Sequence, residues 1–234
     1  MSGLILAVPS KGRLEEATRK VFAKAGLAIE RPGGARSYQG DIPALPGVVV
    51  RFLPASEIAR ELIRGTVHAG VTGADLIHEA SEQGPQSARF ARPLGFGGAD
   101  VVIAVPDAWI DVTSMRDLAD VASDFRAGHG RWLRVATKYL NLTRRYFARF
   151  GIAEYRIVES LGATEAAPAA GAADLIVDIT STGSTLAANG LRIVEDGLIL
   201  KSEANLIVSK TIVWDAEALV LRKSLLGAFG VDGD

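Results

Sequence analysis

A hydroxyl-rich turn follows an apolar run in the last third of the chain. The run Asp174–Ile179 reads as a strand, and Asp178 stands near its end. The turn that follows holds Thr180, Ser181, Thr182, Gly183, Ser184 and Thr185. Such a turn at the start of a helix directs backbone N–H groups and hydroxyls at one point, where the helix N-terminus adds partial positive charge. We therefore expect it to bind a phosphate monoester, with Asp178 accepting hydrogen bonds from sugar hydroxyls. The alternative is a helix N-cap with surplus hydroxyls in a solvated loop.

A second polar turn, Ser10-Lys11-Gly12-Arg13, follows the first apolar run, Leu4–Val8. Lysine offers a mobile point charge and arginine a bidentate fork, and both suit a polyphosphate or pyrophosphate. The alternative is an ordinary helix start whose cations face solvent.

Two glycine-rich turns follow other predicted strands. In Gly70–Asp75, Gly73 allows close backbone approach beside Thr72, and Asp75 is either an N-cap or a ligand contact. In Leu94–Asp100, three glycines precede a buried strand, which indicates a crossing or a hinge.

Further charged side chains stand near predicted strand ends. Lys138 follows the strand Leu133–Thr137 and is placed to meet a phosphate. Arg144 and Arg145 oppose the dipole of the next helix, which indicates an anionic contact or a partner surface; the alternative is a solvated basic face. Glu165 either assists magnesium or a ribose, or faces water.

The elements that position these turns alternate between strand and helix, which is typical of α/β proteins with largely parallel sheets. Two rounds of alternation predict two α/β lobes. We expect lobe I to comprise residues 1–103 and 192–234, and lobe II residues 104–191. Because ligands bind at the carboxyl ends of strands in open α/β sheets, the two lobes should enclose a cleft.

Composition excludes several classes of site and partner. The 234 residues are 48% apolar, carry a formal net charge of −1 and contain no cysteine. Thiolate sites and disulfides are therefore excluded, and no overall field draws the chain to nucleic acid or an anionic membrane. His68, His78 and His129 lack metal-ligand spacing, and we assign no metal a direct protein ligand. Without a signal peptide or a run of about 20 apolar residues, a cytoplasmic location is expected.

Taken in order, five segments resemble the ATP phosphoribosyltransferase family. They are Ala7–Leu14, Gly70–Leu76, Leu94–Asp100, Val135–Phe147 and Asp174–Gly190. The resemblance implies a bilobal fold similar to type II periplasmic binding proteins. It also implies that Asp178 and Thr180–Thr185 hold the ribose 5-phosphate of phosphoribosyl pyrophosphate. Lys11 and Arg13, with Thr72–Asp75 across the cleft, would meet the pyrophosphate or the nucleotide.

The implied reaction is displacement at the anomeric carbon by N1 of the adenine of ATP, with pyrophosphate leaving and substrate-bound Mg²⁺ assisting. Catalytic roles would fall to Lys11, Arg13 and Asp178. Substrate-binding roles would fall to Ser10, Gly12, Thr72, Gly73, Asp75, Lys138, Glu165, Thr180, Ser181, Thr182, Gly183, Ser184 and Thr185.

Leu140 departs from the family pattern, which has proline there. The chain also ends soon after lobe II, as in short-form relatives, which implies a dimer of catalytic chains within a hetero-oligomer that includes a histidyl-tRNA-synthetase-like regulatory subunit.

Two other functions remain open at this point. A non-catalytic bilobal solute- or effector-binding protein would explain the lobes, but not Asp178 beside a hydroxyl-rich turn. A nucleobase phosphoribosyltransferase of the usual fold would present an acidic pair before its loop, where this chain has Val177-Asp178.

Overall fold

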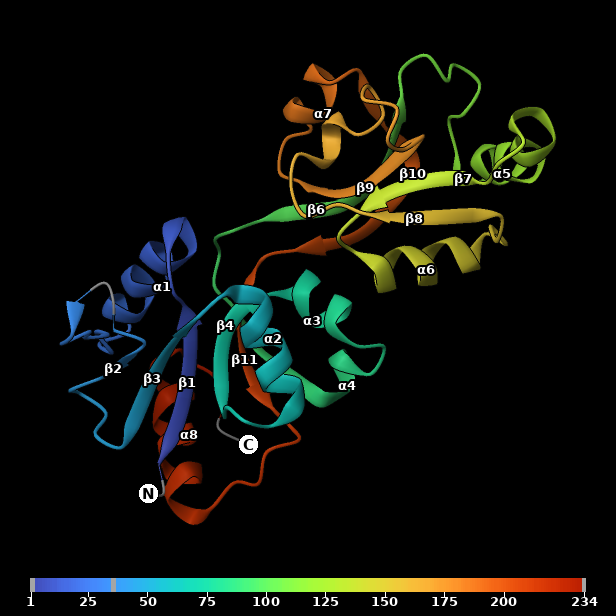
Figure 1. The fold of residues 1–234 in the computed structure, drawn as a ribbon. Coiled ribbons are helices and arrows are strands. Elements are labelled where there is room, and N and C mark those ends of the chain that lie inside the picture. Colours follow the sequence, from blue (N-terminus) through green and yellow to red (C-terminus); the bar gives the residue numbers. More distant parts are fainter. Residues whose placement is uncertain (1–2, 35–36, 233–234) are drawn as a thin grey trace. The chain divides into compact units, whose positions relative to one another are not determined.

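The computed structural model describes residues 3–34 and 37–232. They form two compact units, each with its own mixed sheet (Figure 1). Unit 1 comprises Met1–Gly97 and Glu203–Asp234, and unit 2 comprises Gly98–Ser202. Residues 35–36, inside a segment expected to be a loop or irregular hairpin, lie outside the described residues.

The chain crosses from one unit to the other at positions that differ from the expected crossings between residues 103 and 104 and between residues 191 and 192. Strand β6 (Ala99–Pro106) and strand β10 (Leu191–Ser202) both belong wholly to the sheet of unit 2, because each pairs along its length with the other. The first crossing falls between Gly97 and Gly98, inside the segment Leu94–Asp100. Gly97 has a φ of +67°, a conformation that L side chains rarely adopt.

The sheet of unit 1 has the order β2-β3-β1-β4-β11-β5, and β1 pairs in parallel with β3 and β4. Its strands are β1 (Leu4–Pro9), β2 (Gln39–Asp41), β3 (Val48–Leu53), β4 (Ala69–Gly73), β5 (Ala88–Pro93) and β11 (Ala204–Ser209). Its helices are α1 (Gly12–Lys24), α2 (Ala55–Arg64), α3 (Ala74–Ala80), α4 (Gly84–Ser87) and α8 (Ala216–Ala228). Alternate residues of β1 face opposite layers: Leu6 packs with α1 and α8, and Ala7 packs with α2 and α3.

The sheet of unit 2 has the order β10-β6-β9-β7-β8. Besides β6 and β10, its elements are α5 (Met115–His129), β7 (Leu133–Thr137), α6 (Leu140–Arg149), β8 (Tyr155–Glu159), a 3-10 turn (Thr164–Ala166), β9 (Leu175–Thr180) and α7 (Ser184–Ala188). Ile103 of β6 packs with α5 and α6, whereas Ala104 packs with Leu186 of α7 on the other face. The carboxyl ends of β7, β8 and β9 lie at one edge, because these strands run parallel.

The expectation of largely parallel sheets is wrong in detail. Among the described strands, β2, β5, β6, β10 and β11 pair antiparallel with their neighbours. The returning strand β11 runs against the parallel strands of the unit 1 sheet, and β6 runs against those of the unit 2 sheet. Strand–helix alternation cannot reveal these pairings. The elements α4 and β5 were not anticipated, since they are short or lack apolar periodicity. Strand β2 lies within the segment expected to be a loop or irregular hairpin. Between β8 and β9 the described chain forms a 3-10 turn at Thr164–Ala166. No described helix has the length and apolar character needed to span a bilayer.

An ion-pair cluster joins the starts of β7 and β9. Asp174 accepts two hydrogen bonds from the Arg131 guanidinium, at 2.6 and 2.7 Å, and one from the backbone N–H of Arg134 at 2.8 Å. Partial burial by itself raises the pKa of Asp174, but the hydrogen bonds from Arg131 and Arg134 outweigh it and hold the pKa at about 2. The charged carboxylate therefore stabilises the register of these two strands.

We expect Asp174→Asn to destabilise unit 2 by about 2 kcal/mol at pH 7, since charge-assisted hydrogen bonds are lost. The folded pKa of Asp174 lies below its unfolded value. Its contribution is therefore complete above about pH 5 and disappears as the pH falls towards 2. Urea unfolding at pH 7 and pH 3, followed by tryptophan fluorescence, measures this difference.

The matched control is Asp111→Asn, at an exposed aspartate of the same unit. An Asp174→Asn variant as stable as this control at pH 7 would contradict the role given to the cluster.

Candidate active site

The turn after β9 is held in shape by its own hydroxyls. We call residues 180–185 the 180–185 loop. Thr180 Oγ1 accepts a hydrogen bond from the Gly183 N–H at 2.9 Å, and the hydroxyls of Thr182 and Ser184 lie 2.8 Å apart. Gly183 has a φ of +74° and serves as the N-cap residue of α7. The left-handed glycine lets the strand turn directly into the helix, so the N–H groups of the first helical turn face the loop.

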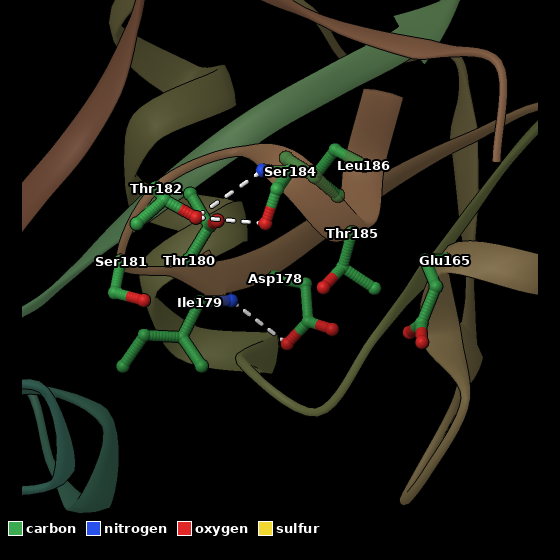
Figure 2. A pocket seen from close by; sticks show the side chains of 9 residues that line it. All are labelled: Glu165, Asp178, Ile179, Thr180, Ser181, Thr182, Ser184, Thr185 and Leu186. Carbon is green, nitrogen blue, oxygen red and sulfur yellow. Dashed lines mark hydrogen bonds between the residues drawn. The ribbon is translucent and has the colours of Figure 1, made fainter. Parts of the chain in front are cut away.

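A pocket of about 260 Å³ opens beside this loop (Figure 2). Its lining comprises Glu165, Asp178, Ile179, Thr180, Ser181, Thr182, Ser184, Thr185 and Leu186. Figure 2 shows the Thr185 hydroxyl and the carboxylates of Asp178 and Glu165 gathered on one side of the loop. The volume is below the range of about 300–1,000 Å³ that is typical of whole drug-sized ligands. It therefore suits a phosphate and its sugar better than a complete nucleotide.

Asp178 is held from two directions. Its Oδ1 accepts a hydrogen bond from the Ile179 N–H at 2.8 Å and lies 3.9 Å from Lys138 Nζ. The ion pair follows from strand register, because Thr137 of β7 pairs with Val177 of β9 and places the next residue of each strand side by side. Lys138 partly balances the carboxylate, so an anion can approach the loop without meeting an isolated negative charge.

Glu165 reaches the pocket through an unusual backbone turn. Ala163 has a φ of +49° and is the non-glycine residue with positive φ among the described residues. The buried Thr164 follows it and donates from Oγ1 to Ser160 Oγ at 3.0 Å. This turn immediately precedes Glu165, which lines the pocket.

The two remaining turns lie together at one edge of the unit 1 sheet, because β1 and β4 are adjacent and parallel. Lys11 is the extended N-cap residue of α1, followed by Gly12 with a φ of +72°. Lys11 and Arg13 are both exposed, as is required of groups that bind a soluble anion. Ser10 stands immediately before them, and its N–H is bonded to Leu53 O.

The side chains at the end of β4 and the start of α3 are less accessible than expected. Thr72 is 1% exposed and donates from Oγ1 to Ala55 O at 2.8 Å, so its hydroxyl ties β4 to α2. Gly73, rather than Asp75, is the N-cap residue of α3, and Asp75 is 5% exposed. At this turn the backbone is therefore a better candidate for ligand contact than the side chains.

Each unit thus contains part of the predicted set of site residues. Unit 2 brings together Asp178, the 180–185 loop, Lys138 and Glu165, and unit 1 brings together Ser10–Arg13 and Thr72–Asp75. The sequence did not identify Ile179 and Leu186 as pocket walls, since apolar residues in a strand and a helix read as core. The link between Lys138 and Asp178 was also missed, and only the strand order could have revealed it.

Comparison with known proteins identifies the family of this chain. The sequence profile of the ATP phosphoribosyltransferase family matches residues 54–225, which is more than half of the chain. A relative from Rhodopseudomonas palustris (strain BisB18), named ATP phosphoribosyltransferase, is 56% identical over 222 residues. That alignment covers 95% of this chain and 68% of the relative. The chain belongs to the ATP phosphoribosyltransferase family.

A second relative of the same name, from Bradyrhizobium sp. (strain ORS 278), is 60% identical over 92% of this chain and 66% of its own length. The chain thus spans about two thirds of the length of these curated relatives.

Solved structures support both the family and the fold. The ATP phosphoribosyl transferase (HisG:HisZ) complex from Thermotoga maritima contains a chain with a TM-score of 0.65 and 29% identity, over 88% of this chain and 86% of that one. The arginine-bound form of truncated ArgBP from T. maritima has a TM-score of 0.53 at 11% identity, over 98% of this chain and 95% of that one. The likeness to the binding protein shows the fold alone.

The departure from the family pattern at Leu140 is structurally mild. Leu140 is the first residue of α6, the position where proline is best tolerated in a helix. Tyr139 precedes it as the N-cap residue and donates its N–H to Thr137 Oγ1 at 2.8 Å. The turn is therefore held by a hydrogen bond.

We expect Gly183→Ala to weaken binding of ribose 5-phosphate by about five- to thirty-fold, because a left-handed alanine costs about 1–2 kcal/mol. A Cβ at this position would meet only Ile193 Cδ1, at 3.9 Å, so the cost is conformational and not a steric clash. Gly183→Asn should recover most of the affinity, since asparagine tolerates this conformation. Isothermal titration calorimetry measures both.

Gly190→Ala is the matched control, with a φ of +66° and open space around the added methyl group. It should lose comparable stability and keep its affinity. Equal affinities for Gly183→Ala and the unchanged chain would show that the loop does not hold the phosphate.

Proposed function

We propose that this chain is the catalytic subunit of an ATP phosphoribosyltransferase. It joins N1 of the adenine of ATP to the anomeric carbon of phosphoribosyl pyrophosphate, releases pyrophosphate and so performs the first step of histidine biosynthesis. The observation that carries the proposal is the pocket beside the 180–185 loop, where hydroxyls and N–H groups suit a 5-phosphate while Asp178 and Glu165 suit ribose hydroxyls. Membership of the family supports the same reaction.

The proposed reaction requires the protein to align the substrates and to stabilise charge, and it needs no protein nucleophile. The 180–185 loop fixes the phosphate end of the substrate, and Asp178 fixes the ribose, so the anomeric carbon is presented in one orientation. Lys138 stays beside Asp178 and lowers the cost of bringing a polyanion to this edge of the sheet. We assign Lys11 and Arg13 to the pyrophosphate or the nucleotide, where positive charge stabilises the departing group.

Magnesium enters the proposal as a substrate-bound ion. Within the described residues, no three or more His, Asp or Glu side chains gather in a way that could hold a metal ion. Asp178 and Glu165 nevertheless line one pocket with oxygen ligands of the type that Mg²⁺ prefers. Asp178 and Glu165 would hold such an ion at this pocket, and the ion would supply neutralisation of the pyrophosphate charge.

We further propose that the chain acts as the short form of the enzyme. Its partners would be a histidyl-tRNA-synthetase-like regulatory subunit and a second catalytic chain, within a cytoplasmic hetero-oligomer. Support comes from the similarity to a chain of the HisG:HisZ complex of Thermotoga maritima. A cytoplasmic location belongs to the same proposal because both substrates are polyanions that do not cross a bilayer unaided.

The test is a mass-spectrometric assay of the purified chain with ATP, phosphoribosyl pyrophosphate and Mg²⁺. It is run alone and with extract from a histidine-prototrophic source that lacks this chain. Phosphoribosyl-ATP and pyrophosphate in either sample establish the reaction, and dependence on the extract supports the short form. Product with free adenine in place of ATP would instead indicate a nucleobase phosphoribosyltransferase. Tight binding of a small solute without any product would favour the bilobal binding protein.

Within this function, Thr182→Val and Thr185→Val should each raise the KM for phosphoribosyl pyrophosphate about tenfold or more. A hydrogen bond to a charged group is worth about 1.5–3 kcal/mol. The kcat should change much less, because the 5-phosphate takes no part in bond breaking and its binding is uniform along the reaction. Steady-state kinetics with varied phosphoribosyl pyrophosphate separates the two constants.

The serine variants Thr182→Ser and Thr185→Ser are the controls, since each keeps the hydroxyl and loses only a methyl group. If both valine variants keep an unchanged KM, the loop does not bind the 5-phosphate.

A further inference from the structure

A second and larger depression lies on unit 2, between α6 and β8. Its volume is about 520 Å³, compared with about 260 Å³ for the pocket at the 180–185 loop, and the two share no lining residue. It is lined by Arg144, Ala148, Ile152, Ala153, Tyr155, Arg156 and Ile157. We call it the α6–β8 groove. The proposed reaction makes no use of it.

The groove runs beside an open sheet edge. Strand β8 is the last strand of its sheet and pairs with β7 alone among the described strands (Figure 1). The N–H and C=O groups along its other side therefore lack a strand partner in the part of the chain that the structure describes. Such an edge is a template for a further strand, unless charges or bulges protect it. Arg156 is the ordinary kind of protecting charge, but it does not explain an adjoining groove with apolar walls at Ile152 and Ile157.

The charge at the groove is positive. Arg144 and Arg156 are exposed, and neither forms an ion pair with a carboxylate of the described chain. No aspartate or glutamate lines the groove. Arg144 also stands close to Tyr155: burial raises the pKa of Tyr155, and the Arg144 charge opposes that shift. Since the whole chain has a net charge of −1, this positive charge is local and favours an acidic ligand.

The shape and charge distinguish between possible occupants. A second copy of this chain, paired edge to edge about a two-fold axis, would offer the groove a strand that carries Arg156 as well as Glu159, which is a less acidic segment than the lining of the groove favours. A small carboxylate would leave the strand edge unused, and this groove is more open than the pocket at the 180–185 loop. An extended acidic segment meets all three features, because its backbone, its apolar side chains and its carboxylates each have a counterpart.

We propose that the α6–β8 groove and the β8 edge bind an extended acidic segment of a different polypeptide. The segment adds to β8 as a further strand, sets an apolar side chain against Ile152 and Ile157, and places carboxylates beside Arg144 and Arg156. This is β-strand addition, in which main-chain hydrogen bonds supply affinity and side-chain pockets supply specificity. The inference does not rest on the proposed reaction, and either can fail without the other.

The test uses a capped heptapeptide of alternating glutamate and valine as the probe, with its lysine–valine counterpart for comparison. The glutamate peptide should slow hydrogen exchange at the amides of residues 155–159 in the intact chain. The double variant R144E/R156E should bind it about tenfold more weakly or worse, and should instead prefer the lysine peptide. Calorimetry measures affinity, and circular dichroism checks that the variant folds. R60E, at an exposed arginine of α2 in unit 1, is the matched control and should behave like the unchanged chain.

Three outcomes would overturn the proposal. One is equal binding of a glutamate peptide N-methylated at alternate residues, which cannot form the strand hydrogen bonds. Another is binding without slower exchange in β8, which would indicate attraction by charge alone. The third is loss of self-association in R144E/R156E during sedimentation, which would assign the groove to a second copy of this chain.

Discussion

The hydrogen-bonded register between β7 and β9 determines what the pocket of unit 2 can do. Val135, Ala136 and Thr137 pair in parallel with Leu175, Ile176 and Val177, so the residues that follow each strand emerge next to one another. Lys138 therefore meets Asp178, and the 180–185 loop begins beside this ion pair. At the opposite end of the same strands, the Asp174 cluster holds the register in place. A slip of one residue would turn every side chain of β9 to the other face and separate the charged pair.

The pocket combines groups that attract an anion with groups that repel one. N–H groups and hydroxyls favour an anion, whereas Asp178 and Glu165 repel one and favour the hydroxyls of a sugar. Such a combination suits a ligand that is itself divided, with a phosphate at one end and donor groups at the other. A site for free phosphate would not need the carboxylates, and a neutral solute would not need the loop. This division is the physical reason why we propose a phosphorylated sugar as the ligand of this pocket.

The sheet of unit 2 also has two very different edges. One edge is β10, whose far end leads the chain back to unit 1 after Ser202. The other edge is β8, which carries no further strand in the described chain and lies beside a basic groove. Asp178 lies on β9, between them. A strand bound to β8 would extend the same sheet that carries the pocket, with β7 as the one intervening strand.

The sequence by itself determined the class of the elements and led to most of the proposed chemistry. The apolar run Leu133–Thr137 became a strand with the expected bounds, because burial demands such runs. Short motifs predicted a phosphate site at the 180–185 loop, because glycine and hydroxyl residues act through local geometry. Tertiary structure alone decided what depends on pairing between distant segments: the antiparallel return of β10 and β11, the meeting of Lys138 with Asp178, and the burial of Thr72 against Ala55. It also decided the left-handed turn at Ala163 and the open edge at β8, since neither leaves a local signature in residue type. Local preferences act within a few residues, whereas register and burial are set by contacts between parts of the chain that the sequence keeps far apart.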